Sequence, residues 1–250
     1  MVMKKQTRGR FYCGLLFAAL LTFLVLKGDT LLMDFLSSSN ALPIRAVEID
    51  GALKELSKKE IVELAGRHAA GRNLASFETA PLQNALLQLP WVAQAVIRKK
   101  MPDKLIISLV EHVPAAYWNE RGLYDARTQS VFYPDLENFH ASLVRLGAVR
   151  DNLAPEVYAL AVQLHEVLRG SGLQMVKLHL DQVRCYTLTL RNGTRLILGR
   201  DRQKAAQRLK RFVLSWQETG LNLDEADYVD LRYEVGFAVG HRKDYGEKGR

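Results

Sequence analysis

Residues 89–118 read LPWVAQAVIRKKMPDKLIISLVEHVPAAYW and contain two apolar runs on either side of the chain-breaking triplet 101–103. In the second run, the odd-numbered residues 105–111 and the even-numbered residues 106–110 face opposite ways, as expected of a strand with two different faces. The first run, around Val96, alternates only in part. The stretch therefore predicts a β-hairpin that packs on helices and leads from one fold unit into the next.

The segment before this hairpin supplies the helices. Residues 44–49 are expected to form a strand that stops at an Asp-Gly turn. Ser57 and Glu60 have the spacing of a capping box, which opens a helix, and a second helix begins near Pro81. Residues 43–113 thus read strand, helix, helix, strand, strand, and we expect a small α+β unit with one shared core.

The chain after this unit is richer in short strands. Strands are expected at residues 117–118, 123–124, 131–133, 176–180, 186–190, 196–198, 228–233 and 237–239, and helices at 155–168 and 201–216. The clearest hairpin signal is Asn192-Gly193, which favours a type I′ turn. We expect residues 114–241 to form an antiparallel sheet backed by two helices, followed by a polar tail over 242–250.

An uncharged apolar segment, residues 11–26, lies near the N-terminus. As a helix it covers about 24 Å, and snorkelling of Lys27 extends the expected membrane span to residues 11–33. The four bases before it predict a cytoplasmic tail, 1–10, and place everything after the linker 34–42 outside the cytoplasm. A cleavable signal peptide is the competing interpretation, but no A-x-A pattern closes the apolar run.

The net charge of +8 is concentrated at the N-terminus, because five of the 35 basic residues precede the first acidic residue, Asp29. The rest of the chain holds 30 basic and 27 acidic residues, which disfavours a nucleic-acid-binding face. The two cysteines, Cys13 and Cys185, provide no disulfide framework.

Motifs for catalysis, metal binding or cofactor binding are missing from the sequence. None of the six histidines has a partner at zinc-ligand spacing, and no phosphate-binding glycine loop or G-x-S-x-G elbow occurs. The late carboxylates, such as Asp224 and Asp227, lack the ordering of a calcium loop and are interpreted as a solvated loop beside a strand. We expect a protein that is not an enzyme, with no cofactor and no metal.

Several long runs resemble the FtsQ/DivIB family of bacterial cell-division proteins across about residues 10–241. The runs that carry the resemblance are LPWV at 89–92, VIRK at 96–99, MPDKLIISLVEHVPAAYWN at 101–119, LTLRNGTRLILGR at 188–200, RLKRFV at 208–213 and YVDLRYEVGFAVG at 228–240. The resemblance implies that residues 43–113 are a POTRA domain and that 114–241 are the family's β domain. It also implies a single-pass inner-membrane protein of the division septum that binds the FtsB–FtsL subcomplex without catalysis.

Candidate binding residues follow from the same resemblance. The expected last strand, residues 228–239, is a candidate sheet edge that a partner strand can complete. The resemblance assigns FtsB binding to this strand and a neighbouring arginine, and the matching positions are Arg184, Arg232, Tyr233, Val235 and Gly236.

The expected roles of these positions differ. The two arginines would pair with partner carboxylates, Tyr233 would supply aromatic area and Gly236 would allow close backbone approach. Val235 departs from the small polar residue that relatives can carry. A purely structural role in the strand is the alternative for each position, and for Tyr233 that alternative is a place in the core.

A second interface is implied on the POTRA domain, at Val96, Arg98 and Lys99. Three consecutive bases at 98–100 are also typical of a solvated turn.

Two other classes of protein remain as alternatives. A POTRA-bearing envelope assembly or secretion component would show tandem POTRA units or a run of barrel strands, and the sequence has neither. A membrane-anchored enzyme acting on the cell wall would show activity of residues 37–250 on peptidoglycan.

Overall fold

The computed structural model describes residues 22, 42–220 and 222–241. They belong to two compact units, which divide between Glu111 and His112. The expected cytoplasmic tail 1–10, membrane span 11–33, most of the linker 34–42 and the tail 242–250 lie outside the described residues. Within the described part of the chain, no helix combines the length and the apolar character that crossing a membrane requires.

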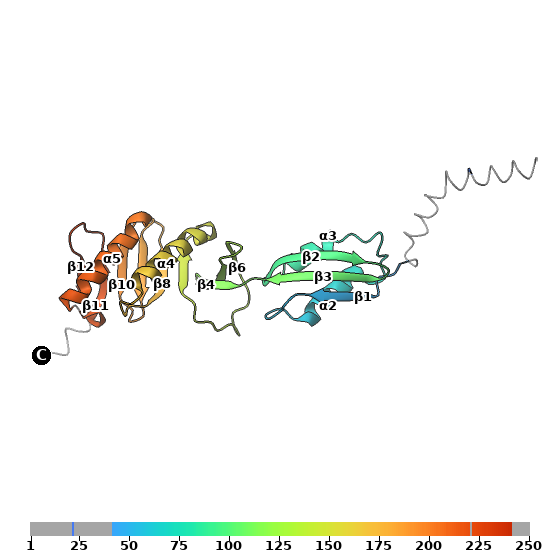
Figure 1. Ribbon diagram of the computed structural model, residues 1–250, viewed down its shortest axis with the longest axis horizontal. Coiled ribbons are helices and arrows are strands. Elements are labelled where there is room, and N and C mark those ends of the chain that lie inside the picture. Colours follow the sequence, from blue (N-terminus) through green and yellow to red (C-terminus); the bar gives the residue numbers. More distant parts are fainter. Residues whose placement is uncertain (1–21, 23–41, 221, 242–250) are drawn as a thin grey trace, which may run out of the picture. The chain divides into compact units, whose positions relative to one another are not determined.

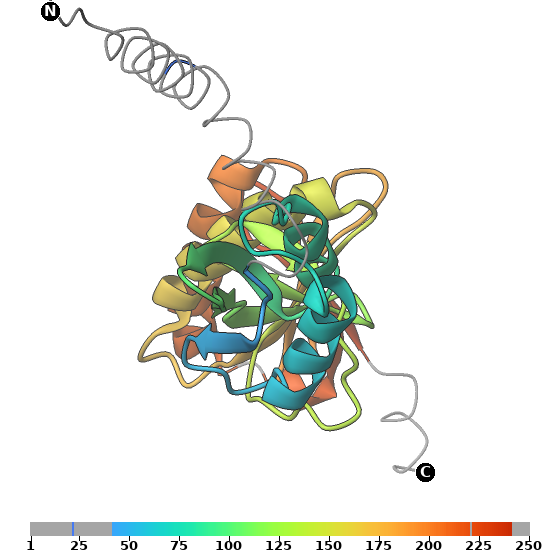
Figure 2. The same ribbon diagram turned by 90° about the vertical axis from the view of Figure 1, so that its right-hand side faces the viewer.

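The first unit has the predicted order of strand, helix, helix, strand, strand. Its elements are β1 (Ala46–Asp50), α2 (Lys58–Ala69), α3 (Ala80–Leu87), β2 (Val92–Lys100) and β3 (Lys104–Glu111). The strands form a sheet of order β1-β3-β2, in which β1 runs parallel and β2 antiparallel to β3. Figure 2 looks onto this unit, with the blue and green strands on one side and the teal helices on the other.

The hairpin β2–β3 buries the face that the alternation predicts. Leu105, Ile107 and Leu109 are buried, and they share one core with the helix residues Ile61 and Leu82. Helix α2 begins directly after Ser57, as predicted, but the Ser57 side chain makes no capping hydrogen bond. The helix is therefore held by burial of its apolar face and not by its predicted capping box.

The loop between β1 and α2 is fixed by the end of β3. The Glu111 carboxylate accepts hydrogen bonds from the backbone N–H groups of residues 54, 55 and 56 at 2.9, 3.1 and 2.8 Å. Gly51 has φ +140°, and a Cβ added there would lie 2.5 Å from the carbonyl oxygen of Leu109. The predicted Asp-Gly turn thus requires glycine at this position.

The second unit contains one large sheet and two long helices. Its elements are β4 (Pro114–Trp118), β5 (Gly122–Asp125), β6 (Ser130–Phe132), β7 (Arg145–Ala148), the 3₁₀ turn η1 (Asp151–Leu153), α4 (Ala154–Leu168), β8 (Met175–Leu180), β9 (Tyr186–Leu190), β10 (Arg195–Gly199), α5 (Arg202–Thr219), η2 (Leu223–Glu225), β11 (Ala226–Asp230) and β12 (Ala238–His241). The nine strands have the order β12-β11-β10-β9-β8-β7-β4-β5-β6.

The prediction of a purely antiparallel sheet is wrong. The pairs β4–β7, β7–β8 and β10–β11 are parallel, and the sheet is mixed. The reason lies in the connections, because α4 joins β7 to β8 and α5 joins β10 to β11, and a helical crossover returns the chain in the same direction. Both helices cover one face of the sheet (Figure 1), where Leu160, Leu164 and Phe212 join its core.

The hairpin at Asn192-Gly193 is present between β9 and β10, but its turn is not type I′. Only Gly193 has a positive φ, of +88°. The N–H of Gly193 donates to the Leu190 carbonyl, and the N–H of Leu190 donates to the Thr194 carbonyl, both at 2.9 Å. This pattern is a three-residue loop with glycine in the left-handed position.

Candidate functional site

The C-terminal strand β12 is an edge of the large sheet, as predicted. It pairs antiparallel with β11, so that Ala238 lies opposite Asp230. The expected strand 228–233, however, ends at Asp230, and residues 231–237 form the loop between the two strands. Gly236, at φ +79°, lies in this loop together with Arg232, Tyr233 and Val235, so the prediction that these residues belong to a strand is wrong.

An internal ion pair fixes the start of this loop. The guanidinium of Arg232 donates to the buried Asp230 carboxylate, from Nε at 2.9 Å and from an Nη at 2.6 Å. The backbone N–H of Arg232 also donates to Asp230, at 3.0 Å. The hydrogen bonds from Arg232 hold the pKa of Asp230 below its ordinary value and outweigh the opposite effect of burial. The Arg232 side chain nevertheless stays 57% exposed, so it remains accessible to a partner.

The other loop residues are presented to solvent. Tyr233 is 55% exposed and Val235 is 94% exposed, so Tyr233 is not part of the core. A Cβ added at Gly236 would meet no atom within 4 Å, which leaves the backbone open to approach. Arg211 of α5 fixes the loop backbone by donating to the carbonyl oxygens of Tyr233 and Glu234 at 2.6 Å each.

Arg184 lies in the turn between β8 and β9, with a left-handed φ of +65°. Its guanidinium donates to Glu156, in the first turn of α4, at 2.8 Å. The buried Tyr186 hydroxyl donates to the same carboxylate oxygen. The Tyr186 hydroxyl and then Arg184 lower the pKa of Glu156, whereas burial and the Glu156 charge raise the pKa of Tyr186.

The sheet register brings Arg184 and Arg232 to the same end of the sheet. Tyr186 lies opposite Gly199 across β9 and β10, and Asp230 lies beside Ile197 across β10 and β11. The starts of β9 and β12 therefore meet the ends of β10 and β11.

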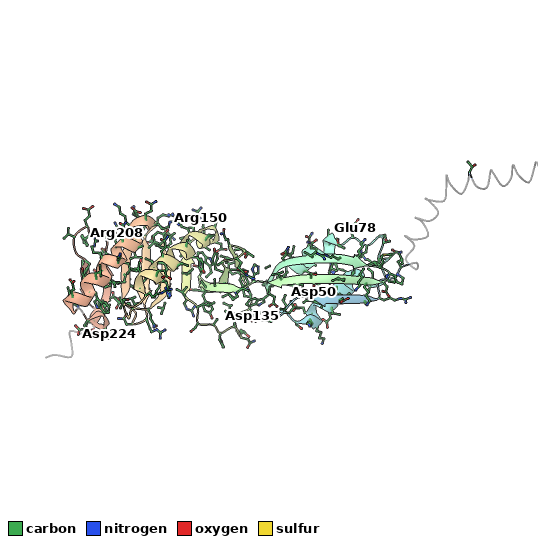
Figure 3. The ribbon with its side chains drawn as sticks, in the orientation of Figure 1. Asp50, Glu78, Asp135, Arg150, Arg208 and Asp224 are labelled. Carbon is green, nitrogen blue, oxygen red and sulfur yellow. The ribbon has the colours of Figure 1, made fainter. Side chains whose placement is uncertain are left out.

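Sequence reasoning missed the contribution of α5 to this end. Lys204, Arg208 and Arg211 line a cavity of about 320 Å³ together with Arg232 and Tyr233. Figure 3 labels Arg208 on α5 at the upper side of this unit, opposite Asp224 at its lower side. The spacing i, i+4, i+7 of the three α5 cations places them on one helix face, and this signal was available in the sequence.

The three POTRA candidates do not form one patch. Val96 and Arg98 lie opposite Ser108 and Ile106 on β3, on the sheet face that points away from the helices. Lys99 points to the other face, where its ammonium donates to the carbonyl oxygen of Ala75 at 2.8 Å. The strand β2 is an edge of its three-stranded sheet.

Over residues 42–220 and 222–241, no group of three or more histidine, cysteine, aspartate or glutamate side chains is arranged to hold a metal ion.

Comparison with known proteins identifies both units. Residues 42–112 match the model of the POTRA domain of the FtsQ type, and residues 116–232 match the model of the C-terminal region of cell division protein FtsQ/DivIB.

Whole-chain relatives agree with these matches. The chain is 32% identical over 241 residues to cell division protein FtsQ of Shewanella oneidensis, covering 95% of this chain and 88% of the relative. It is 30% identical over 230 residues to FtsQ of Vibrio cholerae, covering 91% and 86%. For FtsQ of Neisseria gonorrhoeae the identity is 29% over 208 residues, covering 83% of each chain. The chain therefore belongs to the FtsQ/DivIB family of cell division proteins.

Proposed function

We propose that this protein is a non-enzymatic scaffold of the divisome that binds the FtsB–FtsL subcomplex through the β12 edge and the loop 231–237. In this proposal the chain crosses the inner membrane once near its N-terminus, with residues 1–10 in the cytoplasm and both folded units in the periplasm. It links early and late division proteins at the septum. The membership of the family supports the role in cell division.

The observation that carries the binding proposal is an edge strand beside an exposed loop of mixed chemistry. β12 ends the sheet, so its outer backbone groups can pair with a partner strand. The exposed Tyr233 supplies aromatic area, and the cations Arg232, Arg208 and Lys204 suit acidic residues flanking that strand. A partner of this kind is an extended segment with carboxylates next to an apolar or aromatic residue.

Binding of the FtsB–FtsL complex to the full-length chain tests this interface. We expect Tyr233→Ala and Arg232→Glu each to weaken binding at least tenfold, equivalent to about 1.4 kcal/mol. Arg232→Gln separates loss of charge from the repulsion that a glutamate creates beside Asp230. The matched control is Arg169→Glu, because Arg169 is an exposed arginine at the C-terminal end of α4, and Glu166 is the carboxylate that it pairs with among residues 42–220 and 222–241. Unchanged affinity in both site variants would move the interface elsewhere.

Depletion of the protein from cells tests the divisome role, and complementation tests the POTRA surface. We expect depletion to stop septation, and continued normal septation would contradict the proposal. We also propose a recruitment surface on the open sheet face of β2, formed by Val96 and Arg98, whereas Lys99, the third candidate, lies on the opposite face. Arg98→Glu should then impair complementation, whereas Lys99→Glu, which changes the opposite face, should have a smaller effect.

A further inference from the structure

A second basic pocket lies in the second unit, away from the β12 edge. It has a volume of about 550 Å³ and spans β7, β8, the turn between β4 and β5, and the chain after β6. Its charged lining residues are three bases, Arg121, Arg145 and Lys177, and one acid, Glu120; Asn119, Tyr133, Gly147 and His179 also line it. Leu146 and Leu178 join the core under the helices, so their neighbours Arg145 and Lys177 point to the open face of the sheet.

The charges of this pocket are unbalanced, because three cations line it together with a single carboxylate, Glu120. Arg145 and Lys177 lie directly opposite each other in the parallel pair β7–β8, and Arg121 adds a third exposed cation. Like charges directly opposite across a strand pair are destabilising. Among the residues that the structure describes, none of these three cations makes an ion pair with a carboxylate. The unit thus keeps an arrangement that an anionic partner would stabilise.

The contrast with Arg195 supports this interpretation. Arg195 lies in the same row across the sheet, because Lys177 pairs with Thr189 and Thr189 pairs with Arg195. Its guanidinium is already bound to Asp227 at 2.7 Å. The cations of the pocket, and not every cation of the open face, are therefore left for a partner.

Close packing and hydrogen bonds fix the side chains at the floor of the pocket. A Cβ added at Gly147 would lie 2.8 Å from Asn119 Oδ1 and 2.9 Å from His179 Nδ1, so only glycine leaves room for both side chains. The Asn119 amide donates to the Ala148 carbonyl and accepts from the Ala148 N–H, each at 3.1 Å. Burial and the nearby Lys177 lower the pKa of His179 despite the opposing charge of Asp181, so its imidazole is neutral at pH 7.

Aromatic rings lie beside the charged side chains of the pocket. The Arg145 guanidinium lies 4.8 Å from the centroid of the Tyr117 ring, and this contact holds it on the β4 side of β7, with Lys177 on the other side. Tyr133 is half exposed at the rim, and its hydroxyl donates to Asp151 at 2.5 Å. Its ring is therefore fixed at the rim and can pack against a partner side chain.

Side chains, and not backbone groups, supply the charge of this pocket, and this indicates which kind of anion it can bind. The backbone groups of β7 and β8 are engaged in the sheet, so exposed side chains supply the charge of the site. A single exposed ion pair is worth only about 0–1 kcal/mol, so one small anion gains little here. A segment with several carboxylates can engage all three cations at once and also cover the Tyr133 ring.

We propose that this pocket binds an acidic peptide segment of a protein partner, with at least two carboxylates that engage Arg145, Lys177 and Arg121. The site is separate from the β12 edge and does not rest on the binding proposed there. It gives the protein a second docking point for an acidic segment.

Fluorescence anisotropy with a labelled hexaglutamate peptide tests the proposal on the full-length chain. We expect saturable binding that hexaglutamine does not reproduce. Arg145→Gln and Lys177→Gln should each weaken it at least fivefold, and the double variant at least tenfold. Arg195→Gln is the matched control and should change the affinity less than twofold. Lys177→Gln relieves like-charge repulsion, so its thermal midpoint should equal or exceed that of the unchanged chain, whereas Arg145→Gln also loses the contact with Tyr117 and should unfold at a similar temperature; a cooperative transition in each shows that the variant folds.

Three results would overturn the proposal. The first is binding that is lost with Arg211→Gln, at the cavity beside Arg232, and kept with the Arg145 and Lys177 variants. The second is pyrophosphate alone binding as tightly as the peptide at the same two residues, which would make the site one for small anions. The third is vesicles of anionic phospholipid binding through the same pair while the peptide does not bind.

Discussion

At the scale of single residues, Asp230 connects the stability of the second unit to the proposed binding loop. Its carboxylate holds both the backbone and the guanidinium of Arg232, at the point where β11 ends. A partner that binds Arg232 therefore finds the guanidinium already oriented, and less side-chain entropy is lost on binding. The same pair fixes where the loop leaves the sheet.

Replacing Asp230 by asparagine should reduce stability in a pH-dependent way. The pKa of Asp230 is lowered in the folded chain, so the carboxylate stabilises the fold above its unfolded pKa of about 3.9, and this contribution disappears as the pH falls through the folded pKa. We expect Asp230→Asn to lower the free energy of unfolding of the second unit by about 1–3 kcal/mol at pH 7, as for hydrogen bonds to charged groups. Urea unfolding of the unchanged chain and of the variant, at pH 7 and at pH 3, measures this difference in the free energy of unfolding. A difference between the two chains that grows toward low pH would contradict this account.

At the scale of elements, the pairing of β11 with β12 includes a large side chain opposite a glycine. Tyr228 lies opposite Gly240, and a Cβ added at Gly240 would lie 2.6 Å from Cζ of the Tyr228 ring. The ring covers the glycine and so supplies the packing that the glycine lacks. The register of the edge strand depends on this pair.

Gly240→Ala should therefore weaken the β11–β12 pairing by about 1–3 kcal/mol, the usual cost of overpacking. In a Tyr228→Ala background the same substitution should cost much less, because the ring is gone. Gly66→Ala is the matched control, since Gly66 lies inside α2 with no atom within 4 Å of an added Cβ, and it should stabilise its unit by about 0.5–1 kcal/mol. Equal losses for Gly240→Ala in both backgrounds, measured by urea unfolding, would refute the steric explanation.

The elements also show how far the sequence predicts the fold. The βααββ order and the helices at α4 and α5 were predictable, because their apolar periodicities are local. The strand β7 was missed, since Arg145–Ala148 is only four residues long and exists through parallel pairing with β4 and β8. Pairing direction depends on which strands a crossover brings together, and no local pattern encodes that.

The candidate site was also only partly predictable, because its geometry depends on strand pairing as well as on local sequence. The family resemblance located Arg232 and Tyr233 near the edge strand, but β11 ends at Asp230, where the carboxylate pairs with Arg232, and Gly236 takes a left-handed φ in the loop that follows. The meeting of Arg184 with Arg232 at one end of the sheet follows only from the register of β9, β10 and β11. Arg145 and Lys177 face each other because two segments about thirty residues apart pair in parallel.

At the scale of the whole molecule, the two units have separate cores and separate candidate surfaces. The first core joins α2 and α3 to a three-stranded sheet, and the second joins α4 and α5 to a nine-stranded sheet. The division of labour that we propose gives the POTRA unit a role in recruitment. It gives the second unit two docking points, an edge strand and a basic pocket.

Hydrogen–deuterium exchange of the full-length chain, with and without the FtsB–FtsL complex, tests the central claim most directly. If a partner strand completes the sheet at β12, those amides of residues 238–241 that point away from β11 should exchange at least tenfold more slowly in the complex, and this protection should be lost with Arg232→Gln. Unchanged exchange at 238–241 in a complex that is otherwise fully formed would show that the partner binds elsewhere and would contradict the account.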